Sequence, residues 1–335
     1  MVTFRRVVLP LAAVLLLAGC ASPATLDPDP TSITDAVTLS MTAFQGEWSD
    51  PDLIAENAGA TTVVAVDGIN LAAAGEVTAP SDDALAQLAA AHEAGLPAEL
   101  MVGNFDAALG DFSEELAWTT FSDGAATTAA VTAIAGIVGE QGWDGVSVDM
   151  ESLESRDTAA LVSFVTGLRA MLPEDRSLSI SLQLSDSTAG YADAGYDLAV
   201  FGDTVDRVIL MGYDEHGPWD PTPGPIGSLD WQRAGLDALL EEVPADKVEL
   251  GVAGYGYQWG TESTTTLSVA EARELAGDSA LFDEATGEWT AVLEDGSTIW
   301  WSDGESLALR SALAEEYGLS GLALWVLELA DPIAP

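Results

Sequence analysis

The chain has 335 residues and is 48% apolar, so it can bury a large core, which argues against global disorder. It carries 10 Lys and Arg against 55 Asp and Glu, a formal charge of −45. Such a surface repels nucleic acid and anionic lipid headgroups, so we expect no nucleic-acid partner. The one cysteine, Cys20, excludes an intramolecular disulfide.

The N-terminal residues have the pattern of an export signal. Arg5 and Arg6 precede an apolar run over residues 7–18, and Gly19 and Cys20 follow it. The tetrapeptide Leu17-Ala18-Gly19-Cys20 resembles the bacterial lipobox, in which the cysteine becomes the lipidated first residue of the mature protein. Ordinary secretion with cleavage near this point is the alternative.

The lipobox resemblance implies three expectations about the N-terminal region. Residues 1–19 would be a lipoprotein signal peptide, and residues 20–35, rich in Pro, Asp, Ser and Thr, a flexible tether. The protein would be exported and anchored through Cys20 to the outer face of the bacterial cell membrane. No other apolar run reaches the length of a membrane span.

Strand and helix patterns then alternate along the chain. Eight segments carry the β-branched or alternating pattern of strands: Val37–Phe44, Thr61–Val66, Ala98–Phe105, Gly145–Glu151, Ser177–Leu184, Asp206–Tyr213, Val248–Tyr255 and Leu322–Leu327. Helical patterns lie between them, over Asp82–Ala94, Ser113–Gly139 with a break near Ser122-Asp123-Gly124, Arg156–Leu172, Asp230–Glu242 and Glu305–Tyr317. This alternation predicts an α/β fold, a (β/α)8 TIM barrel, over residues 36–335.

The stretch between the seventh and eighth predicted strands is too long for one helix. Residues 256–303 contain a capping box, Ser268-Val-Ala-Glu271, and a hairpin-like segment, Leu281–Ile299. The pairs Thr286-Gly287 and Asp295-Gly296 are turn signals within that segment. We therefore predict a small α+β insertion on the catalytic face of the barrel.

The fourth predicted strand carries the polar residues that matter most for function. In the octapeptide of residues 144–151, Ser147, Asp149 and Glu151 alternate with apolar residues, so they would point into a barrel. Two carboxylates this close in a low-dielectric interior raise each other's pKa, as a general acid requires. The alternative is a solvated strand end in a chain rich in acids.

Other predicted strand ends carry polar and aromatic residues of a related kind. In TIM barrels, active sites lie at the C-terminal ends of the strands. Those ends hold Asn104, Tyr213, Asp214, Tyr255 and Trp325. Aromatic rings beside carboxylates suit a sugar site, although Tyr213 and Trp325 could be core aromatics and Asp214 a capping residue. With only two histidines in the chain, we expect no metal and no cofactor.

The octapeptide resembles the Asp-Xaa-Xaa-Asp-Xaa-Asp-Xaa-Glu signature of family 18 glycoside hydrolases, the chitinase family. Five further segments fit the family in order: Val102–Phe105, Met211–His216, Pro225–Trp231, Leu250–Tyr257 and Gly321–Trp325. The resemblance covers residues 36–332 and is strongest to the bacterial spore-cortex and cell-wall N-acetylglucosaminidases.

The resemblance implies hydrolysis of N-acetylglucosamine-containing glycans by a monomeric enzyme. In this family the substrate's own acetamido oxygen attacks the anomeric carbon and forms an oxazolinium ion, so that the usual two-carboxylate scheme does not apply. Glu151 would be the general acid and base, and Asp149 would orient the acetamido group. The other implied site residues are Tyr213 as donor to the acetamido oxygen, Trp325 as the floor under the sugar, and Asp214, Asn104, Ser147 and Tyr255 as substrate-binding residues.

One departure from the family signature concerns Ser147, which stands where the family has an acid. Serine can still hydrogen-bond Asp149 but carries no charge, so the pH profile is left open. Asp144, at the first position of the signature, is interpreted as structural.

Two other functions share these features: a non-catalytic glycan-binding protein of the same fold, and a solute-binding lipoprotein. Retention of Glu151, Asp149 and Tyr213 argues against the first, and a single barrel against the second. Chitin, chitooligosaccharides and peptidoglycan all stay open as substrates.

Overall fold

The computed structural model describes residues 39–260 and 264–333, and the predicted signal peptide, tether and Cys20 lie outside them. Eight parallel strands close into a barrel in the order β1-β15-β9-β8-β7-β6-β3-β2. They span Ser40–Gly46 (β1), Val63–Asn70 (β2), Ala98–Gly103 (β3), Gly145–Asp149 (β6), Ser177–Gln183 (β7), Arg207–Met211 (β8), Val248–Ala253 (β9) and Gly321–Trp325 (β15). The predicted (β/α)8 barrel is confirmed.

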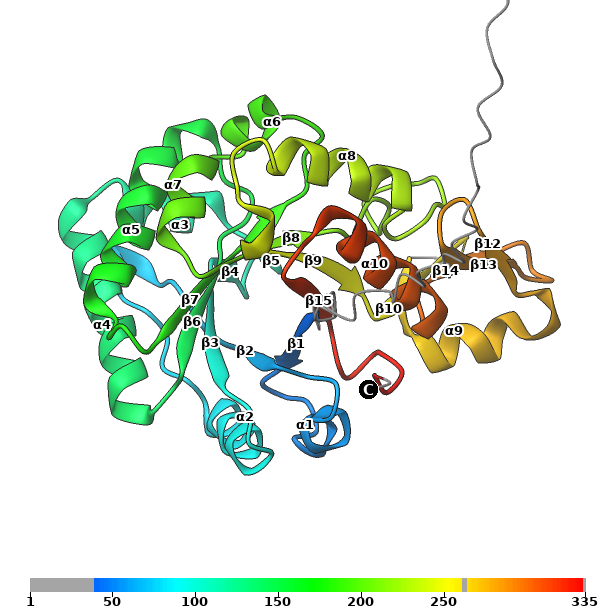
Figure 1. The fold of residues 1–335 in the computed structure, drawn as a ribbon, viewed down its shortest axis with the longest axis horizontal. Coiled ribbons are helices and arrows are strands. Elements are labelled where there is room, and N and C mark those ends of the chain that lie inside the picture. The colour runs from blue at the N-terminus through cyan, green and yellow to red at the C-terminus, as the bar shows by residue number, and fades with distance from the viewer. Residues whose placement is uncertain (1–38, 261–263, 334–335) are drawn as a thin grey trace, which may run out of the picture. The chain divides into compact units, whose positions relative to one another are not determined.

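Helices surround the barrel on its outer side (Figure 1). They are α1 (Asp52–Asn57), α2 (Asp82–Glu93), α3 (Glu114–Phe121), α4 (Gly124–Gln141), α5 (Thr158–Met171), α6 (Thr188–Asp193), α7 (Leu198–Thr204), α8 (Leu229–Leu239) and α10 (Gly304–Tyr317). Within the described part of the chain, no single helix is long and apolar enough to cross a membrane. Only α3 and α4 taken together, bent by 101°, pass that test.

Local sequence signals fix several of these helix ends. Ser81 caps α2, because its hydroxyl accepts from the backbone N–H of Ala84 at 3.0 Å. The predicted break in the long helical region is real, since Asp123 caps α4 two residues after α3 ends. Gly142 then ends α4 in the left-handed conformation, at φ 86°, which glycine adopts without a steric penalty.

The strand residues divide into two sets by direction. Val146 and Val148 belong to the large core between barrel and helices, and the corresponding apolar residues of the other strands join them. A separate apolar cluster fills the barrel interior, made of Phe44, Ala65, Met101, Ile209, Ala323 and Val326. Because side chains pack on both faces of the strands, we expect the functional residues at the strand ends and in the loops that follow them.

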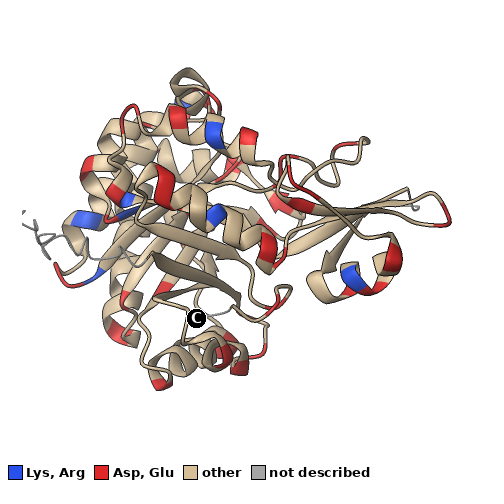
Figure 2. Cartoon of the chain, turned by 45° about the vertical axis from the view of Figure 1, so that its right-hand side comes forward, with Lys and Arg blue, Asp and Glu red and all other residues tan. Residues whose placement is uncertain are grey.

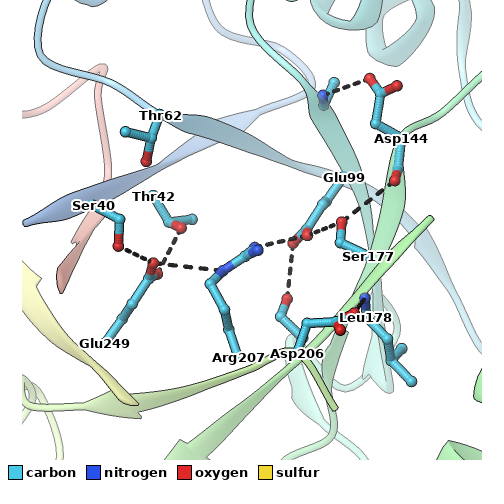
Figure 3. A network of polar contacts seen from close by, with 12 residues as sticks. Ser40, Thr42, Thr62, Glu99, Asp144, Ser177, Leu178, Asp206, Arg207 and Glu249 are labelled. Atoms are coloured by element: carbon cyan, nitrogen blue, oxygen red, sulfur yellow. Dashed lines mark hydrogen bonds and ion pairs between the residues drawn. The ribbon is translucent and has the colours of Figure 1, made fainter. Parts of the chain in front are cut away.

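The interior is polar at the N-terminal end of the barrel (Figure 3). Arg207 donates to Glu99 at 2.7 Å and forms an ion pair with Glu249 at 3.5 Å, and both carboxylates are 0% exposed. Hydroxyls complete the network, with Ser177 and Ser179 donating to Glu99, and Ser40 and Thr42 donating to Glu249. Every oxygen of the two buried carboxylates therefore has a partner.

The insertion between β9 and β15 is a separate antiparallel sheet with one helix. Its strands are β10 (Tyr255–Trp259), β11 (Thr265–Ser268), β12 (Leu281–Asp283), β13 (Glu288–Val292) and β14 (Thr298–Trp301), in the order β11-β10-β14-β13-β12. The helix α9 (Val269–Ala276) begins at the predicted capping box of Ser268 and Glu271. The predicted α+β insertion between the seventh and eighth barrel strands is present.

Some sequence predictions differ from the structure. The predicted strand Val248–Tyr255 crosses a break at Gly254, whose N–H donates to the carbonyl of Trp325, and Tyr255 begins β10 of the insertion. The predicted third strand ends two residues early, because Phe105 starts a small hairpin made of β4 (Phe105–Asp106) and β5 (Asp111–Phe112). Short elements of this kind carry too few residues for a period to be recognised.

Acidic side chains are spread over the helices and loops, with few Lys or Arg among them (Figure 2). Some of these acids have a local structural role. Asp144 accepts from the backbone N–H of Ala98 at 3.0 Å and lies 2.8 Å from the ring nitrogen Nε2 of His92. Asp144 therefore ties the start of β6 to β3 and α2, which fits its predicted structural role.

Candidate active site

The candidate site lies at the C-terminal end of β6. Ser147 and Asp149 point into the barrel, opposite to Val146 and Val148, and Glu151 follows two residues after the strand. The alternation in the sequence therefore predicted the inward set correctly.

The backbone of Glu151 is held by Asn104, at the end of β3. The amide nitrogen of Asn104 donates to the Glu151 carbonyl at 2.9 Å, and its amide oxygen accepts from the Glu151 N–H at 2.9 Å. The same amide nitrogen also donates to the carbonyl of Ser113. Asn104 is 0% exposed, so it fixes the position of Glu151 and presents no surface to a substrate, contrary to the substrate-binding prediction.

The Glu151 carboxylate accepts a hydrogen bond from the side-chain amide of Gln183 at 2.7 Å. Burial raises the pKa of Glu151 to about 7, the hydrogen bond from Gln183 opposes this, and the charges of Asp214 and Asp111 add to it. Glu151 therefore holds a transferable proton near neutral pH. Gln183 was missed in the sequence, although its place as the last inward residue of β7 was a usable signal.

Asp149 is buried beneath Glu151. Burial raises its pKa well above the usual range, and the charges of Glu151 and Asp67 add to the effect. Its atom Oδ1 has no hydrogen-bond partner among the described residues, and neither has the Ser147 hydroxyl. The hydrogen bond that Ser147 is able to give Asp149 is therefore not formed in this structure. Ser147 lies one inward position deeper and is fully buried, so it does not contact the pocket.

Three aromatic rings pack together beside these carboxyls. The Tyr213 ring stacks on Trp325 with centroids 6.5 Å apart, and meets Tyr255 edge-on at the same distance. Burial, followed by the charges of Asp149 and Glu151, raises the pKa of Tyr213. Tyr213 therefore keeps its proton and can donate a hydrogen bond into the site.

Asp214 follows β8 in a left-handed conformation, at φ 66°, which is uncommon for a residue with a side chain. Its atom Oδ1 accepts from the hydroxyls of Tyr255 at 2.5 Å and Tyr257 at 3.0 Å. Burial raises the pKa of Asp214, and these two hydrogen bonds oppose that shift. Tyr255 is 3% exposed and its hydroxyl is engaged, so it orients Asp214, which differs from its predicted role in substrate binding.

A pocket of about 490 Å³ opens over these residues. Its walls include three of the predicted residues, Glu151, Tyr213 and Asp214. The residues that complete it are Asp111, Phe112, Ser152, Gln183, Leu184, Met211, Trp219 and Trp231. Trp219 is 63% exposed at the rim. The hairpin residues Asp111 and Phe112 were not predicted, because the hairpin itself was missed.

A second cavity, of about 260 Å³, lies between α10, the insertion and the C-terminal segment. Its acids, Asp303 and Asp331, both pair with Arg273. It therefore offers no free acid or base. Among residues 39–260 and 264–333, no cluster of His, Cys, Asp and Glu is arranged to hold a metal ion.

A closed parallel barrel with carboxyls and aromatic rings at its C-terminal mouth is an architecture that suits a glycoside hydrolase. The family model for glycosyl hydrolases family 18 matches residues 81–330. The chain therefore belongs to glycosyl hydrolases family 18.

Relatives in sequence include the uncharacterized glycosylase YvbX of Bacillus subtilis, 25% identical over 240 residues, which cover 68% of this chain and 70% of that protein. The cortical fragment-lytic enzyme of B. subtilis is 24% identical, over 66% of this chain and 55% of its own length, so this chain spans about half of that relative.

Solved structures are similar over most of the chain. The chitinase from Chromobacterium violaceum has a TM-score of 0.76 and 28% identity, covering 88% of this chain and 95% of that one. The Bacillus cereus spore cortex-lytic enzyme SleL has a TM-score of 0.78 and 20% identity, over 88% and 72% of the two chains, and supports the fold. The chain is thus a chitinase-like glycosidase related to spore cortex-lytic enzymes.

Proposed function

We propose that this enzyme hydrolyses β-linked N-acetylglucosamine-containing glycans, with the substrate's acetamido group acting as the nucleophile. The observation that carries the proposal is the position of Glu151 at the pocket, with a partly buried carboxyl whose pKa is raised to about 7. Such a group can protonate a leaving oxygen at neutral pH and afterwards accept a proton from water.

The neighbouring residues suit an acetamido nucleophile. Asp149 lies beneath Glu151 with an unpartnered oxygen, which can accept from the acetamido N–H and face the positive charge of an oxazolinium ion. Tyr213 keeps its proton and can donate to the acetamido oxygen. Trp325 stacks on Tyr213 but does not line the pocket in this structure, so its role as the floor under the sugar stays a prediction. Asp214, oriented by two tyrosines, can hold a hydroxyl of the same sugar.

The reaction is expected to retain the anomeric configuration. Attack by the acetamido oxygen inverts the anomeric carbon once, and attack by water on the oxazolinium ion inverts it again. NMR of the first-formed product from a β-linked N-acetylglucosamine oligomer should therefore show the β anomer before mutarotation. The α anomer as first product would contradict the mechanism.

The glycan class is best resolved by digesting purified peptidoglycan and soluble chitin oligomers side by side. Mass analysis of the products should show fragments that end in reducing N-acetylglucosamine. Activity on peptidoglycan alone would define a cell-wall enzyme, and activity on both would define a broader N-acetylglucosaminidase. Intact substrates in both digests would contradict the proposed function.

We further propose that Cys20 anchors the enzyme to the outer face of the cell membrane, because Leu17-Ala18-Gly19 precedes it after a basic start and an apolar run. Cys20→Ala is then expected to release the protein from the membrane fraction of expressing bacteria. Fractionation followed by N-terminal analysis of the mature wild type checks this. A mutant that stays with the membrane, or a mature chain that begins elsewhere, would contradict lipidation at Cys20.

A further inference from the structure

An acid outside the family signature lies level with Asp149 inside the barrel. In a TIM barrel, each layer of inward side chains comes from alternate strands. The pairing registers place Asp67 of β2, Asp149 of β6, Met211 of β8 and Trp325 of β15 in one such layer. On β3, between β2 and β6, the last inward residue is Gly103, which has no side chain to separate the two carboxyls.

The surroundings of Asp67 are acidic. Burial raises the pKa of Asp67 to about 6, and the charges of Glu47, at the end of β1, and Glu328, after β15, add to it. Glu47 is fixed in place by the Ser81 hydroxyl, which donates to it at 2.6 Å. The charge of Asp67 in turn acts on Asp149, whose other charged neighbour is Glu151. The further groups that act on Glu151 and the adjoining Tyr213 are Asp111, Asp214 and Tyr257.

We infer that the negative charge of Asp67 helps the Asp149–Glu151 pair to keep one proton. Asp67 thereby extends the activity of Glu151 to higher pH. This inference rests on the proposed function. Ser147, the neighbouring inward residue on β6, is uncharged. The negative charge that acts on Asp149 from inside the barrel therefore comes from Asp67 on β2.

The sign of the effect follows from the charges. Two coupled acids lose their protons in two steps that belong to the pair, and the catalytic form keeps one proton. Above about pH 6, Asp67 is ionised and opposes the loss of that last proton, because like charges disfavour further ionisation. Removing the charge of Asp67 should therefore let the pair lose its last proton at lower pH.

The first test is the pH dependence of kcat/KM for Asp67→Asn, with hydrolysis of a soluble N-acetylglucosamine oligomer as the assay. The limb where activity falls with rising pH should move to lower pH by roughly half a unit or more. Asp67→Glu, which keeps the charge, should restore the wild-type limb. Asp83→Asn, an exposed acid on α2, controls for net charge and should not move it. An unmoved limb in Asp67→Asn, or an equal shift in Asp83→Asn, would overturn the inference while the proposed function stands.

A second test does not depend on activity. The raised pKa of Asp67 means that its ionisation destabilises the fold, so the contribution of Asp67 to stability falls as pH rises from about 4 to about 6. Asp67→Asn should therefore raise the unfolding temperature at pH 8 and change it little at pH 4. In an Asp149→Asn background the gain at pH 8 should be smaller, since the two sites are coupled. The same gain in both backgrounds would show that Asp67 does not act on Asp149.

Discussion

Replacing Glu151 with Gln is expected to lower turnover of a natural N-acetylglucosamine oligomer by at least about 10²–10⁴-fold, the usual contribution of general acid–base catalysis. Glutamine keeps the size of the side chain and can still pair with Gln183, but it has no proton to transfer. The effect should fall on kcat, with KM close to that of the wild type, because the lost interaction belongs to the transition state.

The leaving group offers a sharp check on this role. A nitrophenyl glycoside needs little protonation on departure, so Glu151→Gln should lose less activity on it than on the oligomer. Glu140→Gln, an exposed acid on α4, removes the same charge and should behave as the wild type on both substrates. An equal loss on both substrates would show that Glu151 does not act as the acid for the leaving group.

The largest expected effect on stability comes from Arg207, at the other end of the barrel. Arg207→Leu leaves the fully buried Glu99 and Glu249 without the guanidinium that contacts both (Figure 3). Removing one partner of a buried ion pair costs about 3–5 kcal/mol, because an uncompensated charge remains in a medium of low polarity. The midpoint of urea unfolding, followed by tryptophan fluorescence, should fall accordingly at neutral pH.

The pH dependence of that loss identifies its cause. Burial already raises the pKa of Glu249 and Arg207 lowers it, so without Arg207 the pKa rises further. A raised carboxyl pKa gives stability at low pH that is lost as the pH rises, so the loss should be larger at pH 8 than at pH 5. Arg233→Leu, which breaks a surface pair with Glu316, should cost only about 0–1 kcal/mol. Equal losses in both variants would contradict the role of Arg207.

The residues whose role follows from periodicity were predictable from the sequence. The alternation over residues 144–151 identified Asp149 and Glu151 as inward-facing, and the strand count identified the barrel. The helix break at Asp123 and the capping box at Ser268 were predictable because they depend on side chains within a few residues.

The roles set by contacts between distant strands were not predictable in this way. Asn104 and Tyr255 were recognised as belonging to the site, but only their hydrogen bonds to Glu151 and Asp214 show that they hold other residues in place. The role of Asp67 could not be predicted from the sequence, because it depends on the barrel register that places Asp67 level with Asp149. In a chain with 55 acids, one more acid on a strand is not distinctive.

Participation of the substrate's own acetamido group is tested most directly with two matched substrates. Wild-type initial rates are measured on a β-linked N-acetylglucosamine oligomer and on the same oligomer with a 2-hydroxyl in place of the acetamido group on the sugar to be cleaved. Hydrolysis of the first, with at most trace cleavage of the second, is the expected result. Comparable rates on the two substrates would contradict the acetamido group as the nucleophile.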